Sequence, residues 1–226
     1  MLVSVVIRTR NEAEWIGRCL FAVANQSLAD FEIVLVDNQS TDETLQIASS
    51  HDLKVVTVPT REFTFGRALN AGIERASGRY VAIVSGHCVP RDNYWLAKLL
   101  GNFQDPSVAG VYGRQEPLPD SSDLDKRDLW TTFGIERRVQ SRDYFFHNAN
   151  SMIRRSVWAR HPFNEELNGL EDRMWAKQVV AEGQVIVYEP LASVFHHHGI
   201  HQGRDEKRAE RVVRVIEMKL NSDQRI

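Results

Sequence analysis

Short apolar runs alternate, along the first half of the chain, with segments in which apolar residues recur every three or four positions. Runs rich in valine and isoleucine, each too short for a helix, predict buried strands. These strands are residues 3–9, 31–37, 53–58, 79–84 and 108–113. The longer spacing predicts helices that include residues 16–23, 40–50, 66–76 and 95–103. This alternation predicts an α/β fold with a doubly wound, mostly parallel sheet flanked by helices.

Two polar residues mark where the first helices are expected to begin. Asn11 follows the first strand, and its side chain can cap the next helix. Ser40 can cap the helix that runs to about residue 50, with Glu43 as its partner in a capping box.

The second half is less regular. The segment 115–128 has two prolines, many polar residues and no periodicity, which predicts a long surface loop or lid. Beyond it we expect a strand–turn–strand, a helix, two further strands and a charged amphipathic helix. These elements are residues 145–154, 169–182, 184–188, 193–197 and 206–220. Since no long linker interrupts the chain, we expect one domain over residues 1–226.

Composition argues against some kinds of partner and indicates the cellular compartment. The 226 residues carry 28 basic and 30 acidic side chains, which argues against a globally basic nucleic-acid binder. Two distant cysteines give no disulfide framework and fit reduced thiols. The apolar start precedes its charges, unlike a signal peptide, and no run of about 18 apolar residues spans a membrane. We expect a cytoplasmic protein; contact with the inner face of the membrane stays open.

Polar residues follow the predicted strands, where ligands bind in sheets of this kind. Asp37 and Asn38 stand at the carboxyl end of the second strand, and an acid and an amide there can hydrogen-bond a nucleobase or a ribose. Alternatively, Asp37 and Ser40 only cap the following helix. The spacing alone leaves both interpretations open.

Histidines form a second candidate site. Ser85-Gly86-His87 follow the fourth strand, and the small glycine allows a close approach of the backbone. In an extended segment His196 and His198 would share one face, so that together with His87 they could hold a divalent ion. The alternatives are a structural role for His87 and a surface cluster of histidines.

Two adjacent carboxylates, Glu171 and Asp172, stand at the start of a predicted helix. The helix dipole favours acidic residues there, so this placement has a purely structural explanation. The alternative is a general base. The chain lacks the phosphate-binding loop G-x-x-x-x-G-K-[ST], a G-x-G-x-x-G after the first strand and a G-x-S-x-G elbow, which argues against an NTPase, a nicotinamide dehydrogenase and an α/β-hydrolase.

Taken in order, five segments resemble glycosyltransferase family 2, the inverting enzymes with the GT-A fold. They are VSVVIRTRNEAEWIGRCLFAV, FEIVLVDNQSTDET, RALNAGIERASGRYVAIVSGHCVP, GLEDRMW and VFHHHG. The resemblance implies a nucleotide-binding half up to about residue 113. It also implies an acceptor and catalytic half with a small antiparallel region over residues 114–205, and then a helix at 206–221.

The resemblance also implies a role for each candidate residue. Thr9 and Asn11 would border the nucleotide, and Asp37 and Asn38 would lie beside the base. Asp172 would be the catalytic base, with Glu171 as the other member of the Glu-Asp motif. The segment 115–128, with the side chains of Trp130, Asn148 and Asn150, would help to form the acceptor site.

The chain departs from the family at the donor diphosphate. Where the family has Asp-x-Asp, this sequence has Ser85-Gly86-His87. The resemblance implies that Ser85 and Gly86 lie near the donor, and that His87 holds Mn²⁺ or Mg²⁺ with His196 and His198. Ser85 cannot supply the missing negative charge, so the need for a metal stays open.

The implied reaction transfers a sugar, with inversion, from a nucleoside-diphosphate sugar to a hydroxyl of a glycan or lipid-linked sugar, in bacterial surface glycan synthesis. The lack of a membrane span favours transfer of single sugars over processive synthesis. One alternative is a nucleotidyltransferase that makes sugar nucleotides, although its usual glycine-rich loop is absent from residues 8–12. The other is a non-catalytic sugar- or nucleotide-binding module, against which the Glu171-Asp172 pair argues.

Overall fold

The structure is a computed structural model that describes residues 1–167 and 169–197. In chain order the first half contains β1 (Val3–Thr9), α1 (Ile16–Ala24), β2 (Phe31–Asp37), α2 (Thr44–Ala48), β3 (Lys54–Thr57), α3 (Phe65–Arg75), β4 (Tyr80–Ser85), β5 (Cys88–Pro90) and α4 (Trp95–Gly101). The second half contains β6 (Val108–Pro117), α5 (Asp123–Thr132), β7 (Arg138–Gln140), β8 (Asn150–Arg154), α6 (Arg155–Trp158), α7 (Glu171–Ala181) and β9 (Val185–His196). Short 3₁₀ turns cover Thr60–Glu62 and Asn102–Gln104.

One mixed sheet joins all the strands in the order β3-β2-β1-β4-β8-β6-β9-β5, with β7 beside β9. Strands β3, β2, β1 and β4 are parallel, as the alternation of strands and helices predicts. Strand β8 lies antiparallel between β4 and β6, and β5 and β7 are antiparallel to β9. Strands β6 and β9 in the second half are parallel to each other. The α/β fold is therefore confirmed, with the first four strands parallel and parallel and antiparallel pairs mixed beyond them.

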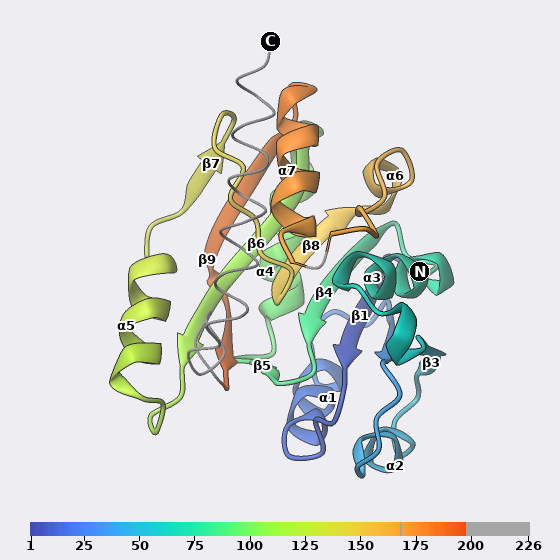
Figure 1. The fold of residues 1–226 in the computed structure, drawn as a ribbon. Coiled ribbons are helices and arrows are strands. Elements are labelled where there is room, and N and C mark those ends of the chain that lie inside the picture. Colours follow the sequence, from blue (N-terminus) through green and yellow to red (C-terminus); the bar gives the residue numbers. More distant parts are fainter. Residues whose placement is uncertain (168, 198–226) are drawn as a thin grey trace.

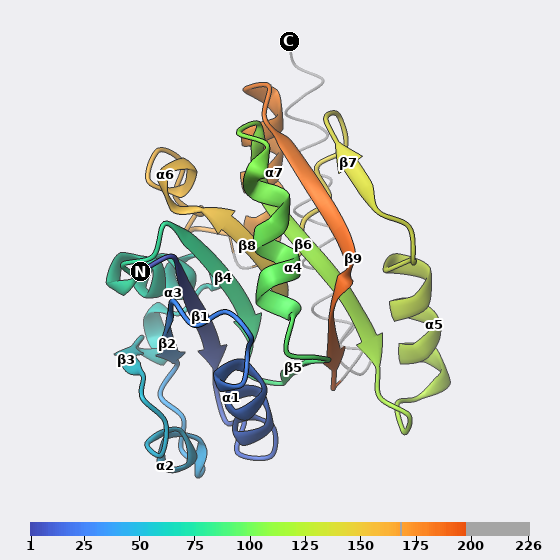
Figure 2. The ribbon, with the colours of Figure 1, turned by 180° about the vertical axis from the view of Figure 1, so that it is seen from behind.

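Helices cover both faces of the sheet (Figure 1). Helices α3 and α7 lie on one face, and α1 and α4 lie on the other, as the reverse view shows (Figure 2). A hydrophobic core lies on each face of the sheet, and alternate residues of β1 belong to the two cores. Val5 and Ile7 pack on the side of α1, and Val6 packs on the side of α3. Because both faces are buried, these strands are continuous apolar runs.

The two predicted helix starts are wrong. Helix α1 begins at Ile16, not next to Asn11, and α2 begins at Thr44, so that the helix is shorter than the expected 40–50. Asn11 and Ser40 instead use their side chains in contacts between two loops. Local capping signals do not reveal such a tertiary contact in advance.

Three expectations for the second half also need correction. Residues 115–128 do not form one loop, because β6 continues to Pro117 and α5 begins at Asp123. Ser122 caps α5 by accepting a hydrogen bond from the Asp125 backbone N–H. Residues 145–154 contain a single strand, β8, and the two strands expected at 184–197 are one, β9. The helix expected at 206–221 and His198 lie outside the described residues.

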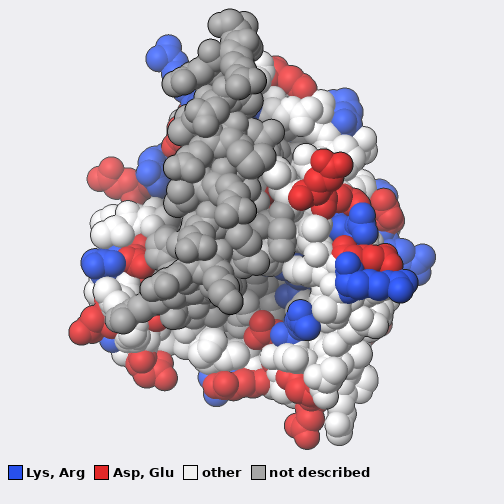
Figure 3. Space-filling model, in the orientation of Figure 1, with Lys and Arg blue, Asp and Glu red and all other residues white. Residues whose placement is uncertain are grey.

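Acidic and basic side chains are intermingled on the described part of the face in Figure 3. This mixture matches the formal net charge of −2 and gives that part of the surface no field of a single sign. Among the described residues, no helix has both the length and the apolar character needed to cross a membrane.

Candidate active site

The carboxyl ends of β1, β2 and β4 meet at one edge of the sheet (Figure 1). The Asn38 N–H donates to the Thr9 carbonyl oxygen at 3.0 Å, and the Gly86 N–H donates to the Arg8 carbonyl oxygen at 2.9 Å. The structure therefore brings together three segments that the sequence singled out separately.

The loops after β1 and β2 are bonded to each other. The Asn11 N–H donates to Ser40 Oγ at 2.9 Å, and Asn11 Oδ1 accepts from the Thr41 N–H at 2.8 Å. Asn11 and Gln39 both have positive φ, at 53° and 51°. Non-glycine residues seldom adopt this conformation, which is enriched at functional sites.

The Asp37 carboxylate forms hydrogen bonds with the loop that follows it. Its side chain is fully buried, and its two carboxylate oxygens accept from Ser40 Oγ at 2.5 Å and from the Ser40 N–H at 3.0 Å. This contact shapes the turn before α2 without capping the helix itself. The described structure thus gives Asp37 a structural partner, and its contact with a base stays a prediction.

Two neighbouring polar groups remain unsatisfied. Thr9 Oγ1 and Asn38 Nδ2 are buried and have no hydrogen-bond partner among the described residues. Buried polar atoms are nearly always paired with protein, water or a ligand, so each exception needs an explanation. These two atoms suit a polar ligand at the ends of β1 and β2. Gly86 keeps this place open, since a β-carbon there would lie 3.0 Å from Thr9 Oγ1.

Arg8, near the end of β1, interacts both with Ser85 at the end of β4 and with the carboxyl group of Glu171. Its guanidinium contacts Ser85 Oγ at 3.4 Å and lies 4.2 Å from the ring centroid of Phe65. It also acts electrostatically on Glu171 across the edge of the sheet. Ser85 is buried and sits beside a cation, where the family pattern has an acid.

The two candidate carboxylates open helix α7. Glu171 is buried, and burial, together with the nearby Asp172 charge, raises its pKa from 4.5 to about 8, although Arg8 opposes this rise. Glu171 is therefore mostly protonated at neutral pH. The Asp172 carboxylate is half-buried and accepts from the backbone N–H groups of Asn148, at 3.2 Å, and Arg173, at 2.7 Å.

A tight turn presents this pair. Gly169 and Leu170 have positive φ values of 99° and 69°, and Leu170 directly precedes the helix. A left-handed leucine is strained by about 1–3 kcal/mol, which the surroundings must offset. The preceding chain is held by α3, because Glu165 accepts from Arg67 Nε at 3.0 Å and from Asn70 Nδ2 at 3.0 Å.

The histidines meet where β5 pairs with the end of β9. The rings of His87 and His196 are stacked with centroids 5.1 Å apart, and Cys88 lies opposite His196 in the pairing. One ligand atom from each of His87, Cys88 and His196 falls within 4.8 Å of the others. The structure thus unites His87 with His196, as the prediction of a shared site requires.

The donor set fits a divalent ion held by imidazoles. Burial raises the pKa of Cys88 well above its ordinary 9.0, so a bound ion would have to displace the thiol proton before the sulfur could serve as a third ligand. Imidazole suits several divalent transition ions, whereas Mg²⁺ prefers oxygen ligands. The residues present therefore fit an ion that accepts two nitrogen ligands.

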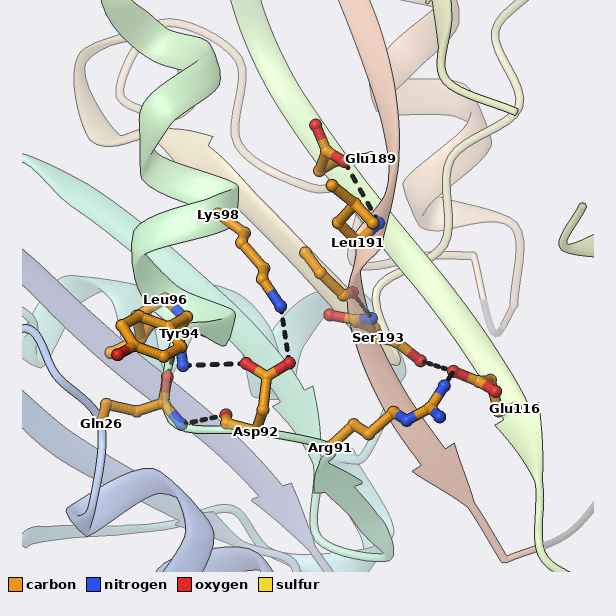
Figure 4. Close-up of polar contacts among 12 residues, drawn as sticks. Gln26, Arg91, Asp92, Tyr94, Leu96, Lys98, Glu116, Glu189, Leu191 and Ser193 are labelled. Atoms are coloured by element: carbon orange, nitrogen blue, oxygen red, sulfur yellow. Dashed lines mark hydrogen bonds and ion pairs between the residues drawn. The ribbon is translucent and has the colours of Figure 1, made fainter. Parts of the chain in front are cut away.

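A polar network anchors the segment after His87 and Cys88 (Figure 4). Arg91 Nη1 donates to Glu116 at 2.7 Å, and Ser193 Oγ donates to the same carboxylate. Burial alone would raise the pKa of Glu116, but the hydrogen bonds from Ser193 and Arg91 outweigh it and lower the pKa. The network holds β5 against β6 and β9 and so fixes the position of the histidine pair.

The three side chains expected at the acceptor site occupy different environments in the structure. Asn148 is buried and its backbone contacts Asp172. Asn150 is instead part of the framework: it accepts from Trp95 Nε1 and donates to the carbonyls of Arg114 and Ala192. Trp130 lies on α5 and is 56% exposed.

Sequence reasoning missed two contributors to the site, Arg8 and Glu12. Glu12 Oε1 lies 2.6 Å from His87 Nδ1. A signal was present, since Arg8 lies near the end of β1 and Glu12 lies in the loop that follows, and the carboxyl ends of parallel neighbours share an edge. Which side chains meet there depends on loop geometry that spacing does not give.

Comparison with known proteins identifies the class. The model of glycosyl transferase family 2 matches residues 4–161. The O-antigen chain rhamnosyltransferase WbaN of Salmonella anatum is 27% identical over 208 residues, which cover 86% of this chain and 66% of WbaN. The chain belongs to glycosyl transferase family 2, and it spans just under two thirds of the length of this relative.

Solved structures share the fold. The structure of S. aureus TarS superposes with a TM-score of 0.70 at 20% identity, covering 87% of this chain and 60% of that one. The mannosyltransferase PcManGT from Pyrobaculum calidifontis, solved with GDP-Man and Mn²⁺, has a TM-score of 0.66 at 24% identity, covering 86% and 56%. Both are glycosyltransferases with the GT-A fold, which confirms the fold that the sequence resemblance implied.

Proposed function

We propose that this chain transfers a sugar from a nucleoside-diphosphate sugar to an acceptor hydroxyl, with inversion at the anomeric carbon. The observation that carries the proposal is the position of the Glu171–Asp172 pair. It opens α7 beside Asn148 and is electrostatically coupled to Arg8 at the end of β1. The unsatisfied Thr9 and Asn38 atoms lie at the same edge and suit the nucleotide.

Asp172 acts as the general base in this proposal. Its carboxylate takes the proton of the acceptor hydroxyl while the oxygen forms a bond to the anomeric carbon. The bond from that carbon to the diphosphate breaks on the opposite face, and its electron pair leaves with the nucleoside diphosphate. The backbone N–H groups of Asn148 and Arg173 orient the carboxylate, and Glu171, protonated at neutral pH, adds no second negative charge beside it.

Negative charge builds up on the departing diphosphate, and fixed positive groups stabilise it. Arg8 is such a group on this chain, held by Ser85 and Phe65. His87 and His196 would hold a divalent ion, Mn²⁺ or Mg²⁺, that supplies Lewis-acid stabilisation when bound, and the structure of PcManGT with Mn²⁺ supports Mn²⁺.

The proposed acceptor is a glycan or a lipid-linked sugar in surface glycan synthesis. WbaN, an O-antigen chain rhamnosyltransferase, supports this context. A lipid-linked acceptor would place the reaction at the inner face of the membrane. Membership of the family argues against the nucleotidyltransferase alternative.

Nucleotide binding is tested by a thermal-shift screen of UDP, TDP, GDP, CDP and CMP, each with and without Mn²⁺ or Mg²⁺. A ligand of the folded state stabilises it by about 2.7 kcal/mol at 100 times its dissociation constant. We expect a shift with one of these nucleotides. The matching nucleotide sugar should then release nucleoside diphosphate, and NMR of the product should show an inverted anomeric centre. Nucleotide binding without release would indicate a non-catalytic module, and a retained configuration would refute the mechanism.

A further inference from the structure

A glutamate makes a short contact with His87, one member of the His87–His196 pair. Glu12 Oε1 lies 2.6 Å from His87 Nδ1, and the side chains of His87 and Glu12 are 15% and 19% exposed. The two residues come from different loops, after β1 and after β4, so 75 positions separate them in the sequence. Neither the proposed donor contacts nor the proposed base makes use of Glu12.

The Glu12 backbone is held firmly. Its N–H donates to Thr44 Oγ1 at 2.7 Å, and its carbonyl oxygen accepts from the N–H groups of Trp15, at 2.9 Å, and Ile16, at 2.8 Å. These bonds fix the turn that leads into α1. The backbone of Glu12 is therefore constrained. This constraint limits the positions that its carboxylate can take and lets the carboxylate orient the His87 ring.

The contact selects one form of the imidazole. A carboxylate at Nδ1 keeps the proton on that nitrogen, so the lone pair lies on Nε2. Histidines that bind metals commonly donate their other ring N–H to a carboxylate, which fixes the tautomer and the ring orientation. The ring so oriented is stacked on that of His196, at an interplanar angle of 8°.

We propose that Glu12 is a positioning residue that holds His87 in the Nδ1–H tautomer and thereby prepares its Nε2 as a ligand for a divalent ion. The proposal rests on the metal site of the proposed function and extends it to a residue behind the ligands. Loss of such a partner typically weakens metal binding 10–100-fold.

The first readout needs no metal. Long-range ¹H–¹⁵N NMR of the imidazoles distinguishes the two neutral tautomers. We expect the Nδ1–H form of His87 in the unaltered chain and a loss of that form in Glu12→Ala. A dominant Nε2–H form in the unaltered chain would overturn the proposal.

The second readout is binding of Co²⁺, followed by its visible absorption. We expect Glu12→Gln and Glu12→Ala to weaken Co²⁺ binding about 10–100-fold, and His87→Ala to abolish it. Glu14→Gln, an exposed neighbour, should bind as the unaltered chain does. Melting temperatures separate these effects from loss of the fold. Unchanged Co²⁺ binding in both Glu12 variants, or no binding by the unaltered chain, would refute the role of Glu12.

Experiments can distinguish a failure of this inference from a failure of the proposed sugar transfer. If the unaltered chain transfers sugar in the presence of EDTA and binds no Co²⁺, this inference and the metal site fall, while the proposed sugar transfer with Asp172 as its base stands. If it binds Co²⁺ through His87 and Glu12 but neither binds nor cleaves any nucleotide sugar, the metal site stands and the proposed function falls.

Discussion

Replacing Glu171 with glutamine should remove a distinctive dependence of stability on pH. The carboxyl group has an ordinary pKa of 4.5, and burial and the neighbouring Asp172 charge raise it to about 8 in the folded chain. Between these two values the folded state binds more protons than the unfolded state. The stabilisation is therefore complete below pH 4.5 and is lost as pH rises toward 8.

The size of the effect follows from proton linkage. One proton of difference changes the free energy of unfolding by up to about 1.4 kcal/mol per pH unit. From pH 5 to pH 7 the unaltered chain should therefore lose up to ~3 kcal/mol that Glu171→Gln keeps. Near pH 5 the two proteins should be similar in stability, since the glutamine amide resembles the protonated carboxyl group.

Urea unfolding of both proteins at pH 5, 6 and 7 measures this difference. The exposed Glu74 on α3 provides a matched control, and Glu74→Gln should follow the unaltered chain at each pH. Parallel stability curves for the unaltered chain and Glu171→Gln, or a variant that loses stability relative to it as pH rises, would refute a buried, protonated Glu171.

Two further perturbations test the framework around the carboxylates. Gly66→Ala should destabilise the fold by about 1–3 kcal/mol, because the new β-carbon would overlap the Asn164 carbonyl group in the chain that leads to α7. Gly101→Ala, with no atom within 4 Å of the added carbon, is the urea-unfolding control, and equal stability of the two variants would contradict this packing. Arg8→Met should extend the pH-dependent loss of stability to higher pH, because the Arg8 charge lowers the folded-state pKa of Glu171 while the onset near pH 4.5 belongs to the unfolded chain; an unchanged upper end of the loss would show that Arg8 does not act on it.

The sequence was most informative where burial dominates. Strands β1, β2 and β4 lie between two helical layers, so their apolar runs mark them within about one residue. Helix α3 begins and ends within one residue of its expected bounds, because the buried positions Leu69, Gly72 and Ile73 keep a helical period.

The errors fall where few residues are buried. Helix α5 buries only Leu129, so its sequence carries no clear period and its prolines and polar residues suggested a loop. In the loop before α2, Ser40 had a local role available as a cap. Its hydroxyl instead donates to the buried Asp37 carboxylate three residues earlier and accepts from the Asn11 N–H of the loop after β1, and this second contact is tertiary.

The candidate site was only partly predictable for the same reason. Each segment at the strand ends was recognisable, and the α/β pattern placed the ends of β1, β2 and β4 on one edge. The contact of Glu12 with His87 spans 75 positions, and the influence of Arg8 on Glu171 spans the sheet edge. Such pairings depend on the three-dimensional course of loops, which spacing along the chain does not encode.

The central claim is that Asp172 is the base of a sugar transfer. Once the donor nucleotide is known, the decisive measurement is donor turnover by Asp172→Asn, with exposed Asp120→Asn as the control. We predict that turnover falls by at least ~10²–10⁴-fold, while nucleotide binding and melting temperature stay close to those of the unaltered chain. Near-normal turnover by a folded, nucleotide-binding Asp172→Asn protein would contradict the assignment.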